Sequence, residues 1–112
     1  MKPIKESEVE FSITVEPEYM TSPREMFPEP CDVELCEKII KDAEWNEWAW
    51  CTVAVKASFK DGAITAEDYL GCCSYEDEAD FKAGGYYEDM RQQALKELNV
   101  KAEALYAALS NR

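Results

Sequence analysis

Residues 48–73 constrain the fold most, because they contain two strand patterns joined by a short turn. From residue 48 to residue 59, apolar side chains alternate with mixed ones, which is typical of a strand with one buried face. Residues 60–63, Lys-Asp-Gly-Ala, have the composition of a hairpin turn. Residues 64–73 alternate again. We therefore predict an antiparallel hairpin.

The alternation also predicts which side chains face the core. In the first strand, Trp48 and Trp50 lie on a wetter face, opposite a continuous apolar row that we expect to face helices. In the second strand, Cys72 points inward, and Tyr69 and Cys73 point outward. Tyr69 is then placed to pair with Trp50 across the hairpin.

Two residues of the second strand depart from its pattern. Asp68 interrupts the inward apolar row, which indicates a bulge, an edge position or a shift in register. Gly71 has no side chain, which indicates a bulge or a close approach of another backbone.

Before the hairpin we expect a strand, a loop and a helix. Residues 8–16 alternate strictly and give a strand with an acidic outer face. Residues 17–30 contain four prolines and are expected to lack regular structure. Asp32 is the expected N-cap of a helix over residues 33–45. We expect residues 1–7 to be frayed.

After the hairpin, Ser74 has the spacing of a capping box and is expected to begin a helix. Gly84-Gly85 should interrupt it, and an apolar stripe then predicts a long helix reaching Leu109, with the whole stripe in the core. The chain thus reads as one α+β domain over residues 1–112. It has a three-stranded antiparallel sheet with helices packed on one face, in the order β-α-β-β-α.

The charge balance narrows the choice of partners. Twelve basic and 24 acidic residues, with no histidine, give a net charge of −12. Such a charge repels phosphate backbones and disfavours direct binding to nucleic acid. It leaves two interpretations, solubility alone or a surface offered to a basic partner.

The sequence offers few parts of a catalytic site. The absence of histidine excludes a Ser-His-Asp or Cys-His site within the chain. No glycine-rich phosphate loop is present, and the adjacent Cys72-Cys73 pair lacks C-x-x-C spacing. Five cysteines without a signal peptide favour reduced thiols in a cytosol. We expect no enzyme, no cofactor, no metal and no membrane span.

Acidic and aromatic residues in the second half are the candidates for binding. Between residues 67 and 89, eight acids stand against one base. Aromatic side chains beside acids suit a protein-binding hot spot. The alternative is that the rings form a second small core under the loop at 17–30, and that the acids cap helices. The candidate binding residues are Trp48, Trp50, Glu67, Asp68, Tyr69, Glu76, Asp77, Glu78, Asp80, Tyr86, Glu88 and Asp89.

The central stretch resembles a family of small uncharacterised phage and prophage proteins. The resemblance rests on the segments at 48–51, 68–75, 80–81 and 85–90, which read WAWC, DYLGCCSY, DF and GYYEDM, with a weaker likeness at 15–18. It covers the latter half of the chain and carries no catalytic residues. It implies a mobile-element protein in the bacterial cytoplasm. Small acidic phage proteins often bind host machinery, and some imitate DNA.

We therefore expect a non-enzymatic phage or prophage accessory protein that binds a host or phage protein through its acidic surface. A basic nucleic-acid-binding protein is the expected partner, which would make the protein a DNA mimic with an anti-defence role. Two alternatives stay open. One is a thiol- or metal-dependent small enzyme or sensor that uses Cys72 and Cys73, and the other is a structural homodimer joined at a strand edge.

Overall fold

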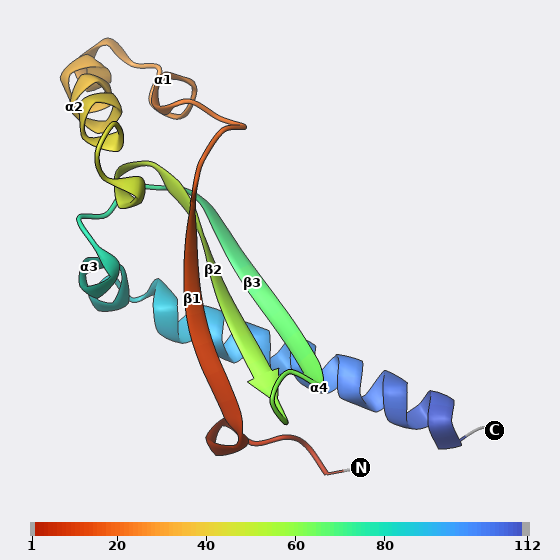
Figure 1. Cartoon of the computed structure of the whole chain (residues 1–112). Helices are drawn as coiled ribbons and strands as arrows, with labels where there is room; N and C mark the ends of the chain where they lie inside the picture. The colour runs from red at the N-terminus through yellow and green to blue at the C-terminus, as the bar shows by residue number, and fades with distance from the viewer. Residues whose placement is uncertain (1, 111–112) are drawn as a thin grey trace.

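The computed structural model describes residues 2–110 and has the predicted α+β architecture, a three-stranded antiparallel sheet with four α-helices (Figure 1). The strands are β1 (Val9–Pro17), β2 (Cys51–Phe59) and β3 (Ile64–Cys73). The helices are α1 (Pro23–Met26), α2 (Val33–Ala43), α3 (Glu78–Ala83) and α4 (Tyr86–Ser110). Short 3-10 turns are η1 (Glu6–Glu8), η2 (Pro30–Asp32) and η3 (Glu47–Ala49).

The sheet has the order β1-β2-β3, so β2 is central and the other two strands are edges. The turn between β2 and β3 occupies the predicted residues. Lys60, Asp61 and Gly62 all have positive φ, at 51°, 56° and 91°. Ala63 N donates to Lys60 O at 3.2 Å and closes the turn. The predicted hairpin is therefore confirmed.

A β-bulge in β3 overturns the predicted orientation of its last two residues. Cys51 is opposite Cys73 and Val53 is opposite Leu70, so β3 contains one residue more than β2 between these pairs. Cys72 is the extra residue of the bulge, and its φ is 56°. Because an inserted residue inverts the alternation, Cys73 points into the core and Cys72 stays half-exposed. The prediction of Cys72 inward and Cys73 outward was wrong.

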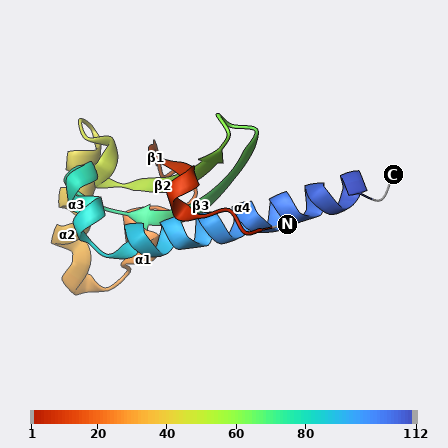
Figure 2. The same cartoon turned by 90° about the horizontal axis from the view of Figure 1, so that it is seen from below.

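Helices α3 and α4 cover one face of the sheet (Figures 1 and 2). Among the described residues, the other face is open except at one end, where the loop at 17–30 covers Trp50. The core lies between the helices and the sheet. Phe81 of α3 and Met90 of α4 pack in one cluster with Val53 and Val55, while Leu98 packs in a second. Both clusters are continuous with the alternating inner residues of β2.

The predicted apolar stripe of α4 is only partly in the core. Met90, Ala94, Leu98 and Ala102 are buried, but residues 105–110 are exposed. The helix extends past the end of the sheet, so its last turns have no strand to pack on (Figure 2). The expectation that the stripe would be core as far as Leu109 was wrong for this end.

Helix α2 confirms the predicted helix but lies beyond one end of the sheet (Figure 1). Cys36 and Ile39 are buried against α1 and η3, while Ile40 is 49% exposed. The loop at 17–30 was expected to lack regular structure, and it contains α1. Ser22 Oγ accepts from Glu25 N at 3.2 Å, a capping box that starts α1 at Pro23.

The N-terminal segment is anchored rather than frayed over residues 2–7. Ile4 is buried, and its backbone N donates to Asn99 Oδ1 at 2.7 Å. Asn99 Nδ2 returns a bond to Ile4 O at 3.2 Å. The side-chain amide of Asn99 thus bonds to both backbone polar groups of Ile4, as a neighbouring strand would. Without it, these groups would lack hydrogen-bond partners. The expected fraying of residue 1 lies outside the described residues.

Helix α3 begins later than predicted. Its N-cap is Asp77, whose side chain accepts from Asp80 N at 2.8 Å, and Ser74 lies three residues before it. Tyr75 N donates to Trp48 O at 2.8 Å, which holds residues 74 and 75 in an extended path. The centroid of the Tyr75 ring lies 5.3 Å from that of Phe81. Tyr75 thus packs on the core from the extended segment, and α3 begins three residues later, at Glu78.

Candidate protein-binding surface

Of the two tryptophans predicted on the wetter face, Trp50 is buried and Trp48 is half-buried. Trp48 belongs to η3 rather than to a strand, and its ring packs on the core side, 5.9 Å from the ring of Phe81. Trp50 does lie on the opposite face, but it is 6% exposed. Its Nε1 donates to Thr21 O at 2.8 Å, and Phe27 stacks edge-on at 6.5 Å. The loop at 17–30 therefore covers Trp50, as the alternative of a small core under this loop predicted. The predicted wetter environment of Trp50 was wrong, and so was the predicted orientation of Trp48, which packs on the core side.

The predicted acidic cluster is divided among three places. Glu67 and Tyr69 lie on the open face of β3, where Tyr69 Oη donates to Glu67 Oε2 at 2.7 Å. This hydrogen bond raises the pKa of Tyr69. Tyr69 is opposite Ala54, so it does not pair with Trp50. Asp68 points to the other face and is half-buried on an edge strand, which is one of the positions that its break in the pattern indicated.

A hollow of about 530 Å³ collects the second group of acids. It lies between the C-terminal end of α2 with η3 on one side and the segment before α3 on the other. Glu76, Asp77 and Asp80 line it together with Asp42 and Trp45. Trp45 is 76% exposed, so its indole is available to a partner.

Hydrogen bonds fix the walls of this acidic hollow. Asn46 Nδ2 donates to Glu76 O at 3.0 Å and joins the two sides. Asp80 Oδ2 accepts from Glu76 N at 3.0 Å, so Asp80 holds the segment that precedes its own helix. Lys38 Nζ lies 2.6 Å from Asp42 Oδ2, which raises the pKa of Lys38. Lys38 is the one cation among the lining residues, against four carboxylates.

The arrangement of the acidic hollow suits a cation carried on a flexible stem. Carboxylates accept charge-assisted hydrogen bonds from lysine or arginine, and the face of an indole attracts the same cations. Within residues 2–110, no group of three or more cysteine or carboxylate side chains is positioned to hold a metal ion. A lysine or arginine side chain in the acidic hollow would meet these carboxylates and the exposed indole of Trp45.

The third group lies along α3 and the first turn of α4. Glu78 forms an ion pair with Lys82 at 3.7 Å, and Glu88 forms one with Arg91 at 3.2 Å. Both carboxylates are partly neutralised on the protein itself. Tyr86 is 55% exposed, and Asp89 is exposed with no salt bridge among the described residues.

The open face of the sheet adds acids that the sequence candidates did not include. Glu10 and Glu16 of β1 point to this face, beside Thr52 and Lys56 of β2. A hollow of about 130 Å³ is lined there by Glu16, Thr52, Glu67 and their neighbours. The strict alternation of residues 8–16 predicted the acidic outer face of this strand. It did not predict that the face would adjoin Glu67.

The five cysteines are free thiols. Burial raises the pKa of Cys51 to about 12 and that of Cys73 to about 11. Both are protonated at neutral pH, and a protonated thiol is a poor nucleophile.

No protein-family model, no curated protein and no solved structure matches this chain. Among residues 2–110, no helix is both long enough and apolar enough to cross a membrane.

Proposed function

We propose that the protein is a non-enzymatic accessory protein, of phage or prophage origin, that binds a basic protein partner in the bacterial cytoplasm through its acidic surface. A host nucleic-acid-binding protein is the partner that best matches the charge. In that role the carboxylates occupy the place of DNA phosphates, and the protein blocks a host defence system.

The observation that carries the proposal is the acidic hollow. It combines four carboxylates with an exposed tryptophan, Trp45, in a chain whose net charge is −12. Long-range attraction by the carboxylates speeds the approach of a basic partner, and a large aromatic side chain supplies the anchor. Trp45 takes the anchoring role first expected of Trp48 and Trp50, which are covered by their own chain.

The alternative of a thiol-dependent enzyme or sensor receives less support from the same chemistry. Of the Cys72-Cys73 pair, Cys73 is buried, and burial raises its pKa to about 11. A reactive cysteine requires a lowered pKa and solvent access, and Cys73 has neither. A site that needs both thiols is therefore disfavoured.

A pull-down from bacterial lysate tests the proposed function. We expect the protein to enrich nucleic-acid-binding proteins, with capture falling as salt is raised from about 50 to about 300 mM, because screening weakens charge attraction. Added duplex DNA should compete with the bait. Trp45→Ala should reduce capture severalfold, since truncated hot-spot aromatics cost binding energy.

Tyr106→Ala is the matched control, because Tyr106 is an exposed aromatic residue at the far end of α4. It should capture as much as the wild type. A partner that resists salt and DNA, or equal loss in both variants, would contradict the proposal.

A further inference from the structure

The two edges of the sheet are covered unequally by the helices. Helix α4 packs mainly against β3 and β2, and β1 lies at the less covered edge (Figure 1). Val53, Val55 and Ala57 of β2 are fully buried, whereas all four inner apolar residues of β1 are only half-buried. These four residues are Val9, Phe11, Ile13 and Val15. The β1 edge therefore retains apolar surface on its helix side.

The backbone of the same four residues faces outward from the sheet. Glu18 N donates to Trp50 O at 3.2 Å, just beyond the last β1–β2 pair. In an antiparallel ladder, hydrogen-bonded pairs alternate, so the even-numbered residues of β1 are the ones that bond to β2. The N–H and C=O groups of the four odd-numbered residues then point away from β2. Among residues 2–110, the Val9 N–H donates to Glu6 O at the end of η1, whereas no side chain and no residue outside the strands bonds to the outward groups of Phe11, Ile13 and Val15.

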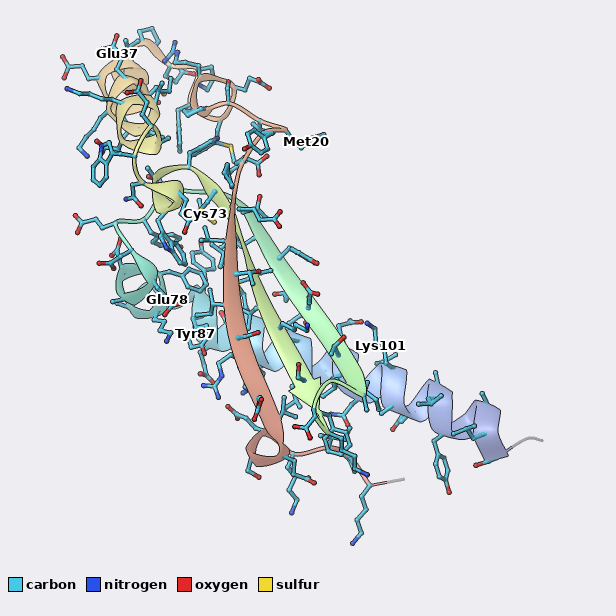
Figure 3. All side chains as sticks on the ribbon, in the orientation of Figure 1. Met20, Glu37, Cys73, Glu78, Tyr87 and Lys101 are labelled. Carbon is cyan, nitrogen blue, oxygen red and sulfur yellow. The ribbon has the colours of Figure 1, made fainter. Side chains whose placement is uncertain are left out.

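The opposite edge is obstructed. Lys101 Nζ donates to Thr65 O at 2.9 Å and blocks an outward carbonyl of β3, and Figure 3 shows Lys101 beside the end of that strand. The bulge at Gly71 and Cys72 bends the same strand, and Asp68 places a charge on its inner side. These are devices that protect a sheet edge against pairing. Strand β1 has a continuous register with β2 over residues 9–17.

Charge decides what kind of strand fits beside β1. Its outer side chains are Glu10, Ser12, Thr14 and Glu16, and none is basic. An antiparallel pairing of two copies centred on Ile13 would place Glu10 of one copy opposite Glu16 of the other. Like charges opposite each other destabilise a strand pair, and each copy carries a net charge of −12. A second copy is therefore a poor occupant.

We propose that the free edge of β1 accepts an extended basic segment of the protein partner as a fourth strand. The segment alternates lysine or arginine, facing Glu10 and Glu16, with apolar residues that cover Ile13 and Val15. The Arg91 guanidinium already lies over the Phe11 ring, 4.6 Å from its centroid. Main-chain hydrogen bonds supply the affinity, and the alternating side chains supply the selectivity. This inference rests on the proposed function and specifies how part of the partner is recognised.

Hydrogen exchange measured by NMR tests the inference with a defined probe, a nine-residue peptide of alternating lysine and valine. Binding should slow exchange at the amides of Phe11, Ile13 and Val15 by about tenfold or more, because these N–H groups gain partners. The amides of Ser12 and Thr14 already bond to β2 and should change little. An alternating glutamate and valine peptide should not bind. The lysine peptide with N-methylated backbone amides should lose most of its affinity.

Charge variants supply the second arm. Glu10→Gln combined with Glu16→Gln should weaken peptide binding about tenfold at low salt. The control combines Glu97→Gln with Glu103→Gln, two exposed acids on α4, and should bind as the wild type does.

Three outcomes would overturn the inference. The first is that the glutamate peptide binds equally well, or that neither peptide binds. The second is protection at the amides of Glu67 and Tyr69 instead, which would place the segment at β3. The third is concentration-dependent protection of β1 without peptide, which would identify a second copy as the occupant. A failed lysate pull-down beside successful peptide binding would contradict the proposed partner class and leave the strand site standing.

Discussion

Glu18 connects three segments at the corner where β1 ends. Its carboxylate accepts hydrogen bonds from the Thr52 hydroxyl and from the backbone N–H groups of Met20 and Thr21, at 3.0 Å and 3.2 Å for the latter two. The backbone of Cys72 in the bulge also favours the charged form of this carboxylate. These bonds, that from Thr52 first, hold the pKa of Glu18 below its usual value. The charged form therefore stabilises the fold.

Glu18→Gln should lower the free energy of unfolding at pH 7 by about 1–2 kcal/mol, as expected for hydrogen bonds to a charged group in a half-exposed site. A carboxylate with a lowered pKa contributes stability above the pKa of the unfolded chain. That contribution disappears as the pH falls through the lower pKa of the folded state. The difference between variant and wild type in urea unfolding should therefore shrink between pH 7 and pH 3.

Glu16→Gln is the control, because Glu16 is exposed and accepts no side-chain hydrogen bond among the described residues. It should change stability little at either pH. A loss for Glu18→Gln that is the same at pH 7 and pH 3 would contradict an origin in the charge.

At the scale of elements, the bulge in β3 decides which of two adjacent thiols reaches solvent. Cys31 is exposed and Cys72 is half-exposed, while Cys36, Cys51 and Cys73 are buried. In the native protein a thiol reagent should label two cysteines readily, and the other three only after unfolding, because thiolate character and access control the rate. Cys72→Ser should remove one of the two fast thiols. If Cys73→Ser removes a fast thiol instead, Cys73 faces solvent as the simple strand alternation predicted, and the assignment from the bulge is wrong.

The elements show why part of this fold was predictable. Strand alternation and the turn at 60–63 are local properties, and they predicted all three strands and the hairpin. Gly71 was recognised as a bulge signal, but the sequence did not show on which residue the inversion would fall. An added Cβ on Gly71 would lie 3.4 Å from Glu18 Oε2, a contact set by a residue more than 50 positions earlier.

The candidate site was less predictable because its parts are distant in sequence. The acids at 76–80 were found as a cluster, but the acidic hollow also needs Asp42 and Trp45 from the end of α2. Trp45 was included in the expected helix, and no periodic pattern marks a residue that follows a helix end. Asn99 likewise lies on a polar position of α4, and its bonds to Ile4 became visible only in the tertiary structure.

At the scale of the whole molecule, shape and charge act together. The chain extends over 59 × 25 × 21 Å, with a radius of gyration of 17.7 Å. A globular chain of this length has a radius of gyration of about 13 Å. Helix α2 at one end and the last turns of α4 at the other account for the elongation (Figure 1). The acids are thereby spread over a long surface, where they repel one another and where the proposed basic partner would be attracted along its length.

That repulsion has a measurable cost in the free protein. Glu10, Glu16 and Glu76 are exposed and form no ion pair among the described residues. Replacing all three with glutamine should raise the melting temperature by a few °C at about 10 mM salt, because the net repulsion falls. The gain should vanish near 1 M salt, where charges are screened within about 3 Å.

The pair Glu78→Gln and Glu88→Gln provides the contrast, because each residue has a cationic partner on its own helix surface. Removing these carboxylates leaves Lys82 and Arg91 with fewer attractions, so the melting temperature should stay level or fall at low salt. If both sets raise it equally, net charge alone governs stability. If only the unpaired glutamates do, the protein keeps acids that weaken its own fold. Solubility alone does not require that particular placement, whereas a surface held ready for a basic partner does.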